Sequence, residues 1–313
     1  MAGKIVCVGT AIVDCIFTRP DGSVAEEVSL CPGGEAFNQA ATLGCLGVQP
    51  VLLAAVGDDH AGRLLISSAE GYGVDTTKLV VRNDAATAVS GLFVDERGQR
   101  RSLVARRSAG ADFVPDISRV DGDIAAVTMS SLFRPPFFDP ERCTLFAKSV
   151  KARGALLLAD TKMPRGTDPK LDDYRNALQY IDIITPNEDE AAHYTGKTDP
   201  AECAAVFHSY GVKWAVIKLG ERGSYISHID GESFFVPAFP ANMVDGIGAG
   251  DAFAAGLLLS LCEGAAMRDA ARFASACGAL CVAHKGAVGG ISSRAQVEKY
   301  YAAAETDSSL RSE

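Results

Sequence analysis

The segment Asp245-Gly246-Ile247-Gly248-Ala249-Gly250-Asp251 leads directly into an apolar stretch, 252–259, that has the character of a buried helix. A glycine-rich turn that opens a helix presents unpaired backbone N–H groups and the positive end of the helix dipole, so it favours a bound anion. Asp251 falls in the first turn, where its carboxylate could accept the proton of a hydroxyl beside a phosphate. An ordinary N-cap is the alternative interpretation of this aspartate. No Gly-Lys-Ser/Thr follows the glycines, so the segment is not a Walker A loop.

On either side of this segment, short apolar runs typical of strands alternate with helical patterns. The expected strands are 4–9, 51–56, 124–129, 155–159, 181–184, 214–218 and 224–228, and the expected helices are 36–46, 60–71, 140–152, 187–195, 200–210, 251–262 and 267–283. Strands and helices in alternation form a largely parallel sheet with helices on both faces. The sequence therefore predicts a three-layer αβα, doubly wound α/β fold.

Two stretches, 11–35 and 87–108, interrupt this alternation. The first is extended and ends in a glycine pair, and the second has the pattern of a hairpin around a polar turn at 95–99. We expect them to form a small β-sheet lid, although ordinary surface loops fit the same pattern. The main nucleotide-binding and catalytic domain then comprises 1–10, 36–86 and 109–304, and 305–313 is predicted to be a flexible tail.

Composition and charge exclude several classes of protein. The chain has 313 residues and a net charge of −9, with no long basic run to neutralise nucleic-acid phosphates. It has no signal-peptide pattern, and no apolar run approaches the roughly 20 residues that span a bilayer. Its nine cysteines are scattered without a CxxC pair, which predicts reduced thiols rather than a zinc site. We expect a soluble, cytoplasmic protein with neither nucleic acid nor membrane as a partner.

Three further turns carry groups that suit a phosphorylated ligand. Glycines at 33–34 precede a helix with Asn38 in its first turn, which offers backbone amides and a side-chain amide to ligand hydroxyls. The acidic turn 186–190 follows an expected strand and suits Mg²⁺ held through water, or it is an acidic first helical turn. The turn 218–223, with spaced glycines, suits phosphate or ribose contacts, or it is a simple hairpin turn.

Taken in order, these motifs resemble those of the ribokinase-like (PfkB) carbohydrate kinases, from Gly9 and Asp14 through Gly286. The matching motifs are Gly33-Gly34-x-x-x-Asn38, Asn187-x-x-Glu190, Gly220-x-x-Gly223 and Asp245-x-x-Gly248-Ala249-Gly250-Asp251. The resemblance implies an ATP-dependent phosphotransferase that phosphorylates a hydroxyl of a small sugar or sugar acid. It also implies that 11–35 and 87–108 are the family's lid, which in several relatives is the interface of a homodimer.

The resemblance assigns roles to individual residues. Asp251 corresponds to the general base, and the anion hole corresponds to Gly248, Ala249 and Gly250. Acceptor contacts fall on Asp14, Gly33, Gly34 and Asn38, and ATP contacts on Asn187, Lys218, Gly220, Gly223, Ser275 and Ala283. Glu190 corresponds to a residue that holds Mg²⁺ through water. A K⁺ site, built mostly from backbone carbonyls, corresponds to Asp245, Ile247, Cys281, His284 and Gly286.

Departures from the family pattern bear on the acceptor and on the K⁺ site. Gly246 and Ile247 replace the usual hydroxyl residues, which weakens the case for K⁺. Ile12 stands where ribose-specific relatives have a polar residue, and the acidic contact expected near 130–132 is absent, so D-ribose is disfavoured. Arg106, followed by Arg107, could bind a carboxylate as in 2-keto-3-deoxygluconate, or the pair is solvated.

Other functions stay open at this stage. A nucleoside kinase of the same fold fits the apolar residues Ile12 and Phe37 near the expected acceptor pocket. A regulator that binds sugar or nucleotide without catalysis is disfavoured by Asp251 and its glycines. An NAD-dependent oxidoreductase is disfavoured because the first strand, ending at Gly9, is not followed by Gly-x-Gly-x-x-Gly.

Overall fold

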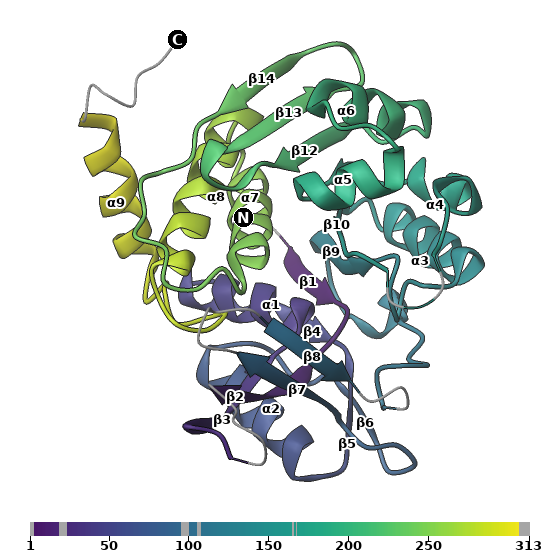
Figure 1. The fold of residues 1–313 in the computed structure, drawn as a ribbon. Helices are drawn as coiled ribbons and strands as arrows, with labels where there is room; N and C mark the ends of the chain where they lie inside the picture. Colours follow the sequence, from purple (N-terminus) through teal and green to yellow (C-terminus); the bar gives the residue numbers. More distant parts are fainter. Residues whose placement is uncertain are drawn as a thin grey trace.

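A sheet of eight strands crosses the centre of the molecule (Figure 1). The computed structural model describes residues 3–18, 24–94, 100–104, 108–164, 166 and 168–306. The strand order is β14 (Ser233–Val236), β13 (Ser224–His228), β12 (Trp214–Lys218), β11 (Ile183–Ile184), β10 (Leu156–Thr161), β9 (Ile124–Leu132), β1 (Lys4–Val8) and β4 (Val51–Leu53). Strands β12 to β4 are parallel, and β13 and β14 continue one edge in antiparallel pairing. The predicted mostly parallel α/β sheet is confirmed.

Helices cover both faces of this sheet because its strands are apolar on both sides. Along β1, Ile5 and Cys7 belong to one core, whereas Val6 and Val8 belong to the other. The first core is covered by α1 (Glu35–Cys45), α2 (His60–Gly71), α7 (Ala249–Cys262), α8 (Met267–Val282) and α9 (Arg294–Thr306). The second is covered by α3 (Pro140–Ala152), α4 (Arg175–Leu178), α5 (Glu188–Thr195) and α6 (Pro200–Ser209). These are the three predicted αβα layers.

A second sheet of four strands lies beside the main sheet, near α1 and α2 (Figure 1). We call it the small sheet, and its order is β3 (Glu27–Gly33), β2 (Ile12–Thr18), β7 (Ala88–Val94) and β8 (Arg100–Val104). The two central strands are parallel and the outer pairs are antiparallel. All four strands come from the stretches 11–35 and 87–108, whereas the predicted turn 95–99 lies outside the described residues.

The structure differs from the sequence predictions at several places, and helices α4 and α9 were not predicted. The expected strand 51–56 is two strands, because β4 joins the main sheet while β5 (Ala55–Gly57) pairs separately with β6 (Val80–Arg82). Strand β14 was missed because only Phe234 and Val236 of its four residues are buried. Helix α9 extends to Thr306, two residues into the stretch predicted as a tail, and 307–313 lie outside the described residues. Within the described part of the chain, no helix combines the length and apolar character needed to cross a membrane.

Candidate active site

The site is built around the first turn of α7. This helix is buried between α1 and α8, so its first turn is held firmly in place. Gly248 precedes the helix in the left-handed conformation, with φ of 80°. A Cβ atom there would lie 2.4 Å from the carbonyl oxygen of Ala287, so both backbone conformation and space require glycine. The glycine turn thus fixes where the helix begins and where Asp251, one turn further on, points.

Asp251 is a buried carboxylate with one oxygen left without a hydrogen bond. Asn38 Nδ2 donates to its Oδ2 at 2.8 Å, whereas Oδ1 has no hydrogen-bond partner among the described residues. The closest cation is Lys162, whose Nζ lies 3.9 Å from Oδ1. Burial raises the pKa of Asp251 to about 7; Lys162 opposes the rise, and the carboxylates of Asp160 and Glu35 add to it. A carboxylate with this pKa can both accept and release a proton near neutral pH.

The ends of two parallel strands add further charged groups. Asp160 in β10 is fully buried, and its Oδ1 accepts a hydrogen bond from Lys218 Nζ, at the end of β12, at 2.7 Å. Lys162 Nζ lies 3.7 Å from the other oxygen of Asp160. Sequence analysis found only Lys218 of these residues. The missed signal was the pair Asp160 and Lys162 at the end of an apolar strand. Because they are two positions apart, both side chains lie on the sheet face that carries α7.

Glu35, at the start of α1, is a further, partly buried charge that sequence analysis missed. Its carboxylate accepts a hydrogen bond from the Thr10 hydroxyl, and its backbone N–H donates to the same hydroxyl at 3.2 Å. Burial would raise the pKa of Glu35, but Lys162 and Thr10 outweigh it, and the pKa is lowered. Gly34, with φ of 98°, permits this approach, because a Cβ atom there would lie 2.6 Å from the Thr10 carbonyl oxygen.

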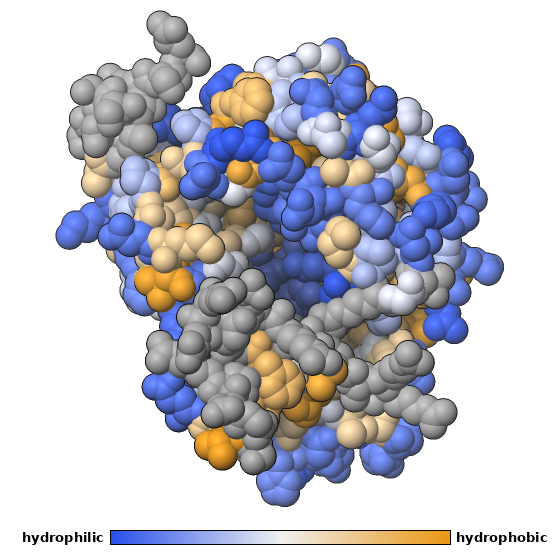
Figure 2. Space-filling model, in the orientation of Figure 1, coloured by the Kyte–Doolittle hydropathy of each residue, from blue (hydrophilic) through white to orange (hydrophobic). Residues whose placement is uncertain are grey.

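A cleft of about 1270 Å³ separates the small sheet from the first turn of α7. In Figure 2 it is the blue hollow above the strands of the small sheet. It brings together the predicted residues Asp14, Gly34, Asn38, Gly248 and Asp251. Gly33 lies at its edge, since a Cβ atom there would be 3.0 Å from Asp14 Oδ2. The predicted contact Arg106 lies outside the described residues.

The acidic turn at 187–190 is locked by hydrogen bonds. Asn187 Oδ1 accepts from the Glu190 N–H at 2.8 Å, and Glu190 Oε2 accepts from the Asn187 N–H at 3.0 Å and from the Thr161 hydroxyl at 2.8 Å. Burial raises the pKa of Glu190, with Lys218 opposing the rise. Within the described residues, no three His, Cys, Asp or Glu side chains gather closely enough to hold a metal ion by themselves. A metal here would need ligands from water or phosphate.

The other predicted nucleotide residues lie around the ends of β12 and α8. Lys218 reaches the glycine turn, since a Cβ atom on Gly250 would lie 3.1 Å from its Nζ. Gly220 and Gly223 flank the tight turn that joins β12 to the antiparallel β13, so the hairpin interpretation is correct for its backbone. The Ser275 hydroxyl donates to the Pro237 carbonyl at 3.3 Å, and Ala283 ends α8. Neither lines the cleft.

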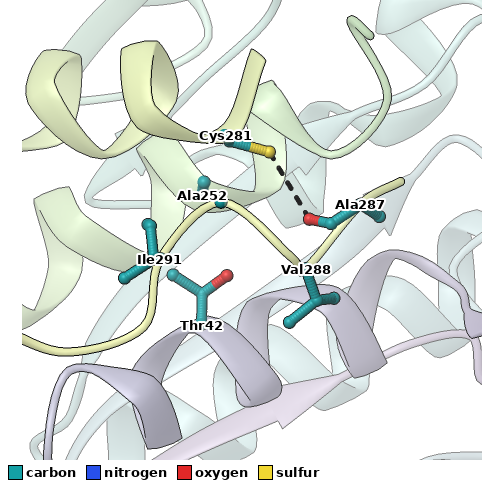
Figure 3. A pocket seen from close by; sticks show the side chains of 7 residues that line it. Thr42, Ala252, Cys281, Ala287, Val288 and Ile291 are labelled. Carbon is teal, nitrogen blue, oxygen red and sulfur yellow. Dashed lines mark hydrogen bonds between the residues drawn. The ribbon is translucent and has the colours of Figure 1, made fainter. Parts of the chain in front are cut away.

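The residues predicted to hold K⁺ converge behind the glycine turn. The Asp245 carboxylate accepts from the backbone N–H of Ile247 at 2.9 Å and of Gly286 at 3.0 Å, which joins two loops. His284 N–H donates to the Cys281 carbonyl at 3.1 Å. Figure 3 shows the Cys281 thiol donating to the Ala287 carbonyl, at 3.4 Å, beside a space too small for a water molecule. This close packing fixes the loop behind the first turn of α7.

The glycine-opened helix, its buried aspartate and the adjoining cleft at the carboxyl ends of parallel strands define a phosphotransferase that acts on small molecules. The chain belongs to the pfkB family of carbohydrate kinases, whose family model matches residues 2–294. The predicted family and enzyme class, a carbohydrate kinase, are confirmed.

Relatives and solved structures agree with this assignment. The chain is 31% identical to probable fructokinase-7 of Arabidopsis thaliana, over 91% of this chain and 88% of the relative. It is similar to the structure of A. thaliana ribokinase complexed with ribose and ATP, with a TM-score of 0.81, 25% identity, and coverage of 96% and 99%. It is also similar to aminoimidazole riboside kinase of Salmonella enterica, complexed with its riboside and an ATP analogue, with a TM-score of 0.80, 25% identity, and coverage of 96% and 100%.

Proposed function

We propose that this protein transfers the γ-phosphoryl group of ATP to a hydroxyl of a small sugar or sugar acid, with Asp251 as general base. The observation that carries the proposal is the free Oδ1 of Asp251, which is buried beside the cleft and belongs to a carboxyl group with a pKa of about 7. An acceptor hydroxyl in the cleft would give its proton to this oxygen as its own oxygen attacks phosphorus.

The residues around Asp251 divide into an acceptor side and a phosphate side. On the acceptor side, Asp14 and Asn38 offer a carboxylate and an amide to sugar hydroxyls, and Gly33 and Gly34 allow close approach to the backbone. On the phosphate side, the N–H groups of 248–250 face the charge that develops on the transferred group. Lys218 beside Gly250, together with Asn187, Gly220, Gly223, Ser275 and Ala283, would bind the nucleotide.

Mg²⁺ fits this donor set when it arrives with the nucleotide. The donors at this end of the sheet are oxygens, the ligand type that Mg²⁺ prefers, and the first turn of α5 carries the carboxylates of Glu188, Asp189 and Glu190. Glu190 and Asn187 would hold its water ligands, and the ion would neutralise charge on the phosphates. The loop bridged by Asp245, with Ile247, Cys281, His284 and Gly286, would hold K⁺. The free cysteines of the chain support a cytoplasmic location.

We further propose that the small sheet is a lid and that a second copy of the chain covers its outer face. The strand register places Asp14 and Ser90 on the face toward the cleft, and Val28, Leu30, Val89 and Leu103 on the opposite face. These four side chains are 41% to 61% exposed. An apolar sheet face of this kind needs a partner in water. Leu30→Ser should therefore convert a dimer to a monomer in light scattering, and a wild-type monomer would contradict the proposal.

The acceptor can be identified by an ADP-release screen. Wild type and Asp251→Asn would be supplied with Mg·ATP, K⁺ and panels of sugars, sugar acids and nucleosides. Turnover of a sugar or sugar acid that depends on Asp251 supports the proposal. Turnover of a nucleoside would favour a nucleoside kinase. The apolar side chains of Ile12, Leu92 and Phe138 in the cleft are compatible with this alternative. ATP binding without turnover of any compound would favour the non-catalytic regulator.

A further inference from the structure

Lys162 lies among the charged groups of the site, and its ammonium group makes no hydrogen bond to the two carboxylates nearest to it. It lines the cleft, and its side chain is 22% exposed. Its Nζ lies 3.7 Å from Asp160 Oδ2 and 3.9 Å from Asp251 Oδ1. Both distances exceed that of a hydrogen bond, and neither oxygen has a hydrogen-bond partner among the described residues. The ammonium group is thus held by charge, with its N–H donors available to a ligand.

The backbone of Lys162 is fixed from three directions. Its N–H donates to the Leu132 carbonyl at 3.1 Å, which continues the pairing of β10 with β9. Its carbonyl accepts from the Tyr194 hydroxyl at 2.6 Å, and the next carbonyl, that of Met163, accepts from Arg134 Nε at 2.6 Å. A side chain that leaves so rigid a base reaches a defined point in the cleft. This is the arrangement expected of a residue that positions a ligand.

The charges that face Lys162 come from every layer around it. They are Asp160 near the end of β10, Asp251 on α7, Glu35 on α1 and Glu190 on α5. Burial would lower the pKa of Lys162, but these four carboxylates outweigh it and raise the pKa, so the ammonium stays protonated. A permanent cation beside the free oxygen of Asp251 therefore faces the space where the acceptor hydroxyl and the phosphate would meet.

We propose that Lys162 binds the phosphoryl group in transit, so that it is a further charge-stabilising residue of the reaction. This inference rests on the proposed function. The acceptor oxygen forms a bond to the γ-phosphorus as the bond from that phosphorus to the β,γ-bridging oxygen breaks, and its electron pair leaves with ADP. The acceptor proton passes to Asp251 Oδ1. Lys162 donates hydrogen bonds to a non-bridging phosphoryl oxygen and keeps its own protons throughout.

The test compares ground-state and transition-state binding. Calorimetry would measure the affinity for Mg·ADP with and without aluminium fluoride, which mimics the transferred group, and a coupled assay would measure turnover of the acceptor from the screen. For Lys162→Met we expect kcat to fall about 100-fold or more and the affinity for Mg·ADP alone to stay within about threefold. The increase in affinity for Mg·ADP that aluminium fluoride causes in wild type should be lost in this variant.

Three variants separate this role from a structural one. Lys148→Met, on the exposed face of α3, should match wild type in every measurement. Lys162→Arg should keep part of the increase in affinity that aluminium fluoride causes, because it keeps the charge. Glu35→Gln/Lys162→Met removes opposite charges together, so it tests the proposal even if the single variant fails to fold. The proposal would be overturned if Lys162→Met or the double variant lost less than about fivefold in kcat. It would also be overturned if aluminium fluoride still increased the affinity of either variant for Mg·ADP as much as it does in wild type. A wild type that turns over no acceptor would instead count against the proposed function.

Discussion

Replacing Asp251 with asparagine should stop turnover and yet stabilise the protein at alkaline pH. The ordinary pKa of an aspartate is 3.8, whereas burial raises that of Asp251 to about 7 in the folded protein. The unfolded chain therefore loses this proton at lower pH than the folded protein. Because the folded pKa is the higher one, the associated stability is fully present below pH 3.8 and is lost as the pH rises through about 7.

The size of this loss follows from the two pKa values. A gap of about three pH units, at about 1.4 kcal/mol each, corresponds to about 4 kcal/mol of unfolding free energy. This amount is lost between the two pKa values, and the loss is complete above about pH 7. Asparagine has nearly the same shape, can accept the hydrogen bond from Asn38, and carries no charge. The difference in unfolding free energy between the variant and wild type should therefore grow in favour of the variant by about 3 kcal/mol as the pH rises from about 4.5 to about 8.5.

Urea denaturation at several pH values would measure this gain, and the same preparations would be assayed for turnover. Wild-type kcat/KM should rise about tenfold per pH unit below pH 7 and level off above it, because only the ionised carboxylate accepts a proton. Asp251→Asn should lose a factor of about 100 to 10,000 at every pH. Asp230→Asn, in an exposed turn, serves as the control. The reasoning would be refuted if Asp251→Asn were less stable than wild type at pH 8.5, or if its kcat/KM were within about tenfold of the wild-type value.

Three further predictions address the remaining parts of the site. Gly248→Ala should lower kcat at least about 100-fold, since its Cβ meets the backbone of 287, whereas Gly264→Ala, with a similar φ and open space, should cost about 1 kcal/mol of stability and leave kcat unchanged. Asp14→Ala should raise the KM for the acceptor at least about tenfold with the KM for ATP unchanged, and equal effects on both would place Asp14 elsewhere. Glu190→Gln should raise the Mg²⁺ concentration for half-maximal rate about tenfold, and an unchanged Mg²⁺ titration would remove Glu190 from the metal site.

The chain's local patterns determined most of the architecture. Helices α2 and α3 begin and end at the predicted residues. Their starts are set locally, because the capping aspartates Asp59 and Asp139 lie three positions before the N–H groups that they cap. The glycine turn before α7 was recognisable for the same reason, since the conformation that it needs is a property of a few consecutive residues. The division of 51–56 into β4 and β5 was missed because the apolar pattern of a strand does not indicate with which strand it pairs.

Only the tertiary structure decided the electrostatics of the site. Glu35, Asp160 and Lys162 are single charged residues beside apolar or glycine-rich stretches, and nothing in the sequence shows that they meet one another. Folding brings them from α1 and β10 to within reach of Asp251, out of water, where charges interact strongly and a carboxyl pKa can rise to about 7. Neither the desolvation of these groups nor their distance from Asp251, which is more than 80 positions away in the chain, is encoded at any one position. The sequence therefore identified the base but not the charges that set its proton affinity.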